Sequence, residues 1–324
     1  PIYIICGNIS LLSDSLKNIW LIKTNSLGDT LWTNTFGGGH YSLGRSVQQT
    51  TDGGFIICGY TNISGKMGEV YLIKTDSLGD SLWTNTFGGT GEEMGNFVQQ
   101  TTDGGYIIIG NSFPSPPYGG LKTYLVKINE FGNEQWYKHF DFGVMQHTGY
   151  SVKQTSDGGY IICGWYTVGY YDTDMYLMKT DSLGDTLWTN SYGGSYEEYA
   201  ISMDITTDGG YVICGYTRGG DSDVYLIKTN GSGTEQWSQT FGGNWGEDEA
   251  YSVQQTSDEG FIICGTTNSF GNGGYDIYLI KTDSAGVEQW NKTYGGANRD
   301  VGYSAKQTSD GGFIICGYTQ SFGN

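Results

Sequence analysis

The sequence predicts an all-β protein built from one four-stranded unit that repeats along the chain. Two observations indicate this fold class. An apolar run that ends in glycine returns every 50 to 54 residues, and no stretch has helical periodicity. The composition agrees, because 54 Gly, 26 Tyr and only 4 Pro among 324 residues suit many short strands joined by tight turns.

The repeat is marked by residues that recur in step. The glycines that close the apolar run are Gly7, Gly59, Gly110, Gly164, Gly215, Gly265 and Gly317. Six tryptophans keep the same spacing: Trp32, Trp83, Trp136, Trp188, Trp237 and Trp290. Six lysines do the same: Lys23, Lys74, Lys127, Lys179, Lys228 and Lys281. Because each residue type returns in every copy, we interpret the lysines as paired structural groups and the tryptophans as core.

One copy is expected to contain four strands, a to d. Strand a is predicted at Ser46–Thr50, strand b at Phe55–Thr61, strand c at Val70–Thr75 and strand d at Leu82–Phe87. A single sheet of this kind cannot bury both of its faces, so neighbouring copies must pack together. Short antiparallel units fit the blades of a β-propeller better than the coils of a solenoid.

We expect one propeller domain over residues 1–324, with both ends cutting through a repeat. Its repeats lie near residues 1–44, 45–95, 96–149, 150–199, 200–249, 250–301 and 302–324. Strand b occurs seven times, and strands a, c and d occur six times each. We favour seven blades, since every strand b then has a place, and six blades remain the alternative.

Residues 154–164 read Gln-Thr-Ser-Asp-Gly-Gly-Tyr-Ile-Ile-Cys-Gly, and residues 176–185 read Tyr-Leu-Met-Lys-Thr-Asp-Ser-Leu-Gly-Asp. This pattern resembles a family of bacterial secreted β-propeller proteins with kelch-like or WD-like blades. Members often carry a C-terminal sorting module. The resemblance covers nearly the whole chain and implies a secreted or cell-surface location. It implies no particular activity, and the Gly-His and Trp-Asp signatures of WD repeats are absent.

The net charge of −18 argues against nucleic acid and against an anionic membrane surface, since both require a basic patch. No apolar run is long enough to insert into a bilayer. The 6 cysteines occupy one position of the repeat, where neighbouring sheets stand too far apart for a disulfide, so we expect reduced, buried thiols.

Catalytic signatures are absent: the 3 histidines have no zinc-site spacing, and there is no phosphate loop or nucleophile elbow. Whether the protein is an enzyme is left open, and we favour a binding or scaffold domain. One alternative is a polysaccharide-acting enzyme that uses loop carboxylates. Another is a purely structural element of a surface assembly.

The a–b and c–d turns hardly change between copies, whereas the b–c and d–a loops vary in length and content. Loops that differ can specialise, so a glycan or protein ligand is expected on the face that they form. Aromatic rings and carboxylates in these loops suit such ligands. The candidate contacts are Trp245, Glu247, Asp248, Tyr196, Glu197, Trp165, Tyr170 and Tyr171.

No cofactor is predicted, but two Asp-x-Asp pairs in front of strand c make Ca²⁺ an open alternative. The pairs are Asp172 with Asp174 and Asp221 with Asp223. Ca²⁺ takes six to eight oxygen ligands, and each pair supplies only some of them. The aligned Asp174 and Asp223 also suit a turn-capping role. The oligomeric state does not follow from the sequence.

Overall fold

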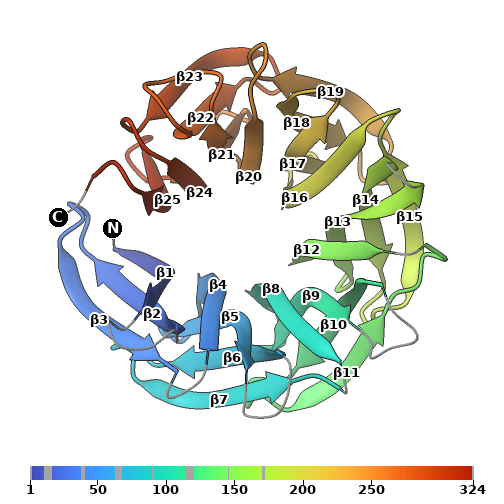
Figure 1. Ribbon diagram of the computed structural model, residues 1–324. Helices are drawn as coiled ribbons and strands as arrows, with labels where there is room; N and C mark the ends of the chain where they lie inside the picture. The colour runs from blue at the N-terminus through green and yellow to red at the C-terminus, as the bar shows by residue number, and fades with distance from the viewer. Residues whose placement is uncertain are drawn as a thin grey trace. The chain divides into compact units, whose positions relative to one another are not determined.

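The computed structural model describes residues 2–10, 17–37, 41–62, 68–89, 91–113, 120–144, 146–169 and 172–322. These residues form twenty-five β-strands and no helix (Figure 1). Those of the first three repeats are β1 (Tyr3–Ser10), β2 (Lys17–Thr24), β3 (Thr30–Phe36), β4 (Tyr41–Gln49), β5 (Phe55–Asn62), β6 (Glu69–Thr75), β7 (Ser81–Phe87), β8 (Glu92–Gln100), β9 (Tyr106–Phe113), β10 (Lys122–Ile128) and β11 (Glu134–His139).

The later strands follow the same order of a, b, c and d. They are β12 (His147–Gln154), β13 (Tyr160–Gly169), β14 (Asp172–Thr180), β15 (Thr186–Tyr192), β16 (Glu197–Ile205), β17 (Tyr211–Arg218), β18 (Ser222–Thr229), β19 (Glu235–Phe241), β20 (Asp248–Gln255), β21 (Phe261–Thr267), β22 (Asp276–Thr282), β23 (Glu288–Tyr294), β24 (Asp300–Gln307) and β25 (Phe313–Thr319).

The predicted four-stranded antiparallel unit is confirmed. Strands β4 to β7 pair in chain order, as do β8 to β11 and β20 to β23. At the two ends of the described chain, β1 to β3 form a three-stranded sheet and β24 with β25 a two-stranded one. The described strands thus contain seven copies of strand b and six each of a, c and d, and the number of blades stays a prediction.

Strand a is longer than the sequence indicated, because a β-bulge interrupts its alternation. In the second repeat it covers Tyr41–Gln49 rather than Ser46–Thr50, and the pairing register shifts between Gly44 and Ser46. An extra residue at a bulge breaks the two-residue periodicity from which a strand is recognised. The d–a loops are correspondingly shorter than expected.

The chain divides into two compact units. One unit contains residues 1–162 and 180–186, and the other contains residues 163–179 and 187–324. The boundary falls within the fourth repeat. The expectation of a single domain over residues 1–324 therefore stays a prediction, and each unit is described by itself.

The core of each unit is formed by strands b and c, packed sheet against sheet. In the first unit, Ile56, Leu72 and Val126 are completely buried. The recurring tryptophans lie between consecutive repeats, as expected for core residues: Trp83 packs edge-on against Tyr106 with ring centroids 6.1 Å apart. In the second unit, Trp237 makes the equivalent contact with Phe261 at 5.8 Å.

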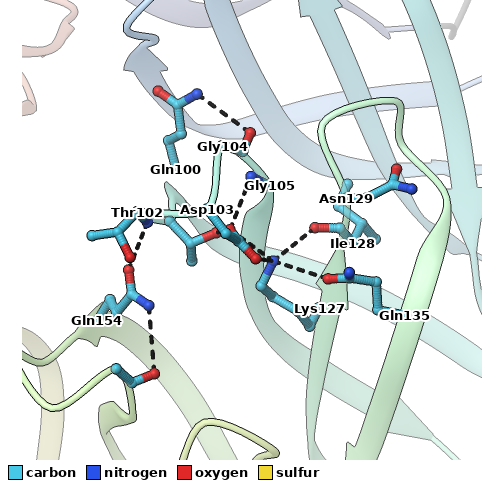
Figure 2. A network of polar contacts seen from close by, with 12 residues as sticks. Gln100, Thr102, Asp103, Gly104, Gly105, Lys127, Ile128, Asn129, Gln135 and Gln154 are labelled. Atoms are coloured by element: carbon cyan, nitrogen blue, oxygen red, sulfur yellow. Dashed lines mark hydrogen bonds and ion pairs between the residues drawn. The ribbon is translucent and has the colours of Figure 1, made fainter.

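Four of the recurring lysines are buried and paired with the aspartate of the a–b turn, as Figure 2 shows for Lys127: Lys74, Lys127, Lys228 and Lys281. Lys127 Nζ donates to Asp103 Oδ2 at 2.9 Å, to the Ile128 carbonyl at 3.0 Å and to Gln135 Oε1 at 3.1 Å. Gly105 is required beside this contact, because a Cβ there would lie 2.5 Å from Lys127 Nζ. The structural interpretation of these lysines is confirmed here.

Lys23, the lysine of the first repeat, has different contacts. Its Nζ donates to the Ser77 carbonyl at 3.1 Å. The ammonium also lies over the rings of Trp32 and Phe55, 5.6 Å from each centroid, which is a cation–π arrangement.

The cysteines agree with the expectation of buried thiols in the interior repeats but not at the ends. Cys58, Cys214 and Cys264 are free and completely buried. Burial raises the pKa of the Cys264 thiol to about 12 and that of Cys214 well above its ordinary value. Cys6 and Cys316 are only half-buried, because the sheets that contain them have three and two strands.

Candidate functional site

The variable loops of the second unit form a polar surface with two prominent aromatic rings. Tyr196 lies in the loop between β15 and β16, and Trp245 in the loop between β19 and β20. Between them is the loop that joins β17 to β18, which carries Asp221. Tyr196 is 55% exposed and Trp245 is 96% exposed, so both rings are presented to solvent.

A pocket of about 460 Å³ opens beside Tyr196. Its polar and aromatic lining comes from β16 to β19, from the loop before β16 and from the loop between β17 and β18: Tyr196, Glu198, Thr217, Asp221, Asp223, Tyr225 and Thr240. Glycines line the rest of the wall, and Gly219 has a specific role there. A Cβ on Gly219 would lie 3.0 Å from the Tyr196 ring, so the glycine leaves room for that ring at the pocket edge.

Two carboxyl groups of the pocket have raised pKa values. Burial raises the pKa of Glu198, and the charges of Asp174 and Asp172 raise it further, although Gly194 N and Thr217 Oγ1 each donate to it at 3.2 Å. Burial likewise raises the pKa of Asp223, together with the charges of Asp221 and Asp248.

Trp245 is held in a backbone conformation that few side chains adopt. Its φ of 66° lies in the left-handed region, one of two such non-glycine residues among those described. Its backbone N donates to Asp221 Oδ2 at 3.2 Å, and the neighbouring Gly246 carbonyl accepts from Ser222 N at 3.1 Å. These backbone hydrogen bonds hold the turn in place, and the indole of Trp245 contacts solvent.

The next residue, Glu247, is equally well held. Its backbone N donates to Asn268 Oδ1 at 2.6 Å, and its carbonyl accepts from Asn268 N at 3.1 Å. Its carboxylate accepts a hydrogen bond from the Tyr275 hydroxyl, and the Arg299 guanidinium lies 4.9 Å from the centre of the Tyr275 ring. Glu247 and Tyr275 thus continue the polar surface away from Trp245.

Three of the other predicted contacts lie in strands rather than loops. Asp248 begins β20, is completely buried, and accepts from Gly243 N at 3.0 Å and Ser269 Oγ at 2.6 Å. Glu197 begins β16 and accepts from the Tyr199 hydroxyl at 3.1 Å. Trp165 lies within β13, half-buried, edge-on to Tyr199 at 5.2 Å. Tyr170 and Tyr171 lie outside the described residues.

The loop placement was wrong for these three residues because strands a and b extend further than their alternation indicated. Asp248 and Glu197 belong to the part of strand a that precedes the bulge, where the register shifts between Ala250 and Ser252 and between Ala200 and Ser202. The pocket is instead lined by Glu198, Thr217 and Tyr225, which were not among the predicted ligand contacts. The acidic position of Glu198 does recur in the repeat, and that recurrence was the available signal.

The four aspartates considered for Ca²⁺ lie at the start of strand c or directly before it. Asp172 and Asp174 begin β14, Asp221 precedes β18, and Asp223 is its second residue. In the described part of the chain, no three His, Cys, Asp or Glu side chains converge as a metal site. These residues alone therefore do not complete a calcium loop.

Comparison with known proteins shows the fold. No protein-family model matches the chain, and no curated protein matches it. Among solved structures, the periplasmic gluconolactonase of Pseudomonas aeruginosa matches with a TM-score of 0.59 and 12% identity, over 89% of this chain and 80% of the other. A protein of unknown function from Dyadobacter fermentans matches with a TM-score of 0.50 and 11% identity, over 88% and 85%.

A puromycin hydrolase mutant complexed with PGG also matches, with a TM-score of 0.54 and 12% identity. The match covers 88% of this chain and 48% of the hydrolase. The likeness to propeller proteins, together with four-stranded antiparallel sheets, supports a β-propeller fold. At these identities the comparisons carry no activity over to this chain. Among the described residues, no helix is long and apolar enough to cross a membrane.

Proposed function

We propose that this protein is a non-enzymatic binding domain whose ligand is a glycan, held by the pocket beside Tyr196 and by the exposed ring of Trp245. The observation that carries the proposal is Trp245 itself. An indole that is 96% exposed on a hydrogen-bonded turn with positive φ serves no packing purpose. Strained backbone that the surroundings hold in place is typical of functional positions.

The pocket chemistry favours a sugar among the expected ligands. The ring of Tyr196 offers a flat face for the apolar side of a sugar ring, and Asp221, Asp223 and Glu198 offer oxygens to its hydroxyl groups. Because the turn that carries Trp245 is already held in place, less conformational entropy is lost when a ligand binds. A protein ligand on the same surface is the second expectation, and the net charge of −18 would favour a basic partner.

We further propose a location outside the cytoplasm, on the cell surface or secreted. The support is the repeat resemblance stated above and the match to a gluconolactonase described as periplasmic. The excess of acidic residues speaks against nucleic acid as a partner. Binding outside the cell would give the variable loops their role as the surface that meets the ligand.

The test is a glycan array on the whole chain, followed by calorimetric titration of the best ligand. Trp245→Ala and Tyr196→Ala should each weaken binding by about thirtyfold or more, because an aromatic anchor contributes about 2 kcal/mol or more. Tyr294→Ala is the matched control, since Tyr294 is 45% exposed but lies on strand β23. Equal affinities for all four proteins would contradict the proposal.

One observation favours a second candidate, a polysaccharide-acting enzyme. Glu198 and Asp223 line the same pocket and both have raised pKa values, as catalytic acids often do. Release of reducing ends from a bound polysaccharide would support catalysis if Glu198→Gln and Asp223→Asn each abolished it. Binding without any such release would leave the binding role as the function.

A further inference from the structure

Each junction between repeats in the second unit places two acidic side chains against the same glycine. One acid comes from the start of strand c, and the other comes from the start of strand a in the next repeat. The three pairs are Asp174 with Glu198 at Gly193, Asp223 with Asp248 at Gly242, and Asp276 with Asp300 at Gly295.

The third pair shows the geometry most clearly. A Cβ placed on Gly295 would lie 1.8 Å from Asp276 Oδ1 and 2.8 Å from an oxygen of Asp300. Asp276 and Asp300 are each 1% exposed. Both carboxylates thus converge on one buried point that only a glycine leaves open, and any larger residue would fill it.

No basic side chain neutralises these pairs. In the second unit, Arg218 forms an ion pair with Glu249, Lys228 with Asp208 and Lys281 with Asp258. None involves a member of the three acidic pairs. Buried charges in proteins are paired or bind a cation, because an isolated carboxylate in the interior is very costly.

The pairs also leave carboxylate oxygens without a partner. Asp276 Oδ1 is buried and accepts no hydrogen bond, and it is the atom directed at the Gly295 position. The other oxygen of Asp276 accepts from Asn272 N at 2.7 Å. Asp248 Oδ1 is likewise buried and unpartnered in the second pair. These two oxygens can therefore bind a group from outside the protein.

Equivalent positions in the first unit show that the fold accepts other side chains there. Lys122 and His147 occupy the positions of Asp276 and Asp300 in the third and fourth repeats, and Thr123 N donates to His147 Nδ1 at 3.0 Å. Another junction of this unit has an acidic pair as well, since buried Glu69 and Glu93 both lie beside Gly88. The same strand geometry therefore forms without two carboxylates, and the acidic pairs require another explanation.

We propose that the acidic pair of Asp276 and Asp300 binds a divalent cation of the calcium class, and that the pairs at Gly242 and Gly193 repeat this site. All the donors are hard oxygens, which select Ca²⁺ or Mg²⁺ over transition metals. Ca²⁺ fits better, since it tolerates irregular sets of oxygen ligands and Mg²⁺ demands a near-ideal octahedron. Two carboxylates supply part of the set, with water and backbone oxygens as the remaining ligands. The site of Asp276 and Asp300 is independent of the sugar pocket, whereas Glu198 and Asp223 of the other two pairs also line that pocket.

The test is calorimetric titration of the whole, EDTA-treated chain with CaCl₂, with MgCl₂ in parallel, combined with thermal unfolding. Ca²⁺ should bind and raise the melting temperature progressively with its concentration, because a ligand of the folded state stabilises that state. Asp276→Asn should lose one equivalent of bound Ca²⁺. Glu288→Gln removes an exposed carboxylate of neighbouring β23 and should bind as the parent does.

A purely structural pair would behave differently. In EDTA, Asp276→Asn should melt higher than the parent because it removes the repulsion between two buried charges, and in Ca²⁺ this order should reverse. Absence of Ca²⁺ binding at millimolar concentration would overturn the proposal, as would unchanged stoichiometry in Asp276→Asn. An increase of stability toward acid pH that Ca²⁺ does not alter would assign a shared proton to the pair instead, and would equally overturn it.

Discussion

The buried lysine and turn aspartate of each repeat predict a specific acid sensitivity. In the fifth repeat, Lys228 is 5% exposed and its Nζ donates to Asp208 Oδ2 at 2.8 Å. Asp208 also accepts from Thr206 Oγ1 at 2.5 Å and from Gly210 N at 3.0 Å. Burial alone would raise the pKa of Asp208, but these bonds outweigh it and lower the pKa to about 2.

The size of the effect follows from that pKa. A fall from 3.8 to about 2 corresponds to at most about 2.5 kcal/mol of folding free energy. Because the Asp208 side chain is 53% exposed, solvent screening reduces this to roughly 1 kcal/mol. Since the folded pKa is depressed, the contribution is present above the unfolded pKa near 4 and is lost as the pH falls through about 2.

Asp208→Asn should therefore destabilise the protein at pH 7 by about 2 kcal/mol, the lost contribution plus the cost of a poorly paired buried ammonium. The difference should shrink toward zero near pH 2, where the parent aspartate is protonated as well. Urea unfolding followed by tryptophan fluorescence at pH 7, 4 and 2.5 measures this. Glu235→Gln, an exposed acid on β19, is the control. A penalty that is the same at every pH would refute the electrostatic reasoning.

Two further predictions concern glycine and cysteine positions of the repeat. Gly215→Ala should lower the free energy of unfolding, measured in urea, by about 3 kcal/mol, because its Cβ would lie 1.7 Å from the Tyr199 carbonyl oxygen. Gly194→Ala is the control and should change this free energy little, since there is open space around Gly194. Iodoacetamide should modify half-buried Cys316 in the native protein well before completely buried Cys214, as mass spectrometry of digests would show; equal rates would contradict the burial argument.

Much of the fold was predictable because the same residue types recur at the same positions in each repeat. The glycine-closed run of strand b, the lysine of strand c and the tryptophan of strand d each recur, and the structure places Lys127 and Trp83 in the predicted structural roles. The start of strand a was not predictable, since the bulge between Gly44 and Ser46 breaks the alternation on which strand recognition depends.

The sequence by itself determined the class of sheet, the order of strands and which loops are free to vary, because these depend on local patterns. It also indicated Tyr196 and Trp245, since these aromatic residues lie in variable loops and do not recur at the same position in the other repeats. Only the tertiary structure brought Asp276 and Asp300 to one glycine and placed Glu198 in a pocket. The physical reason is that burial and the approach of two carboxylates depend on how strands of consecutive repeats pack, and no local sequence pattern records that distance.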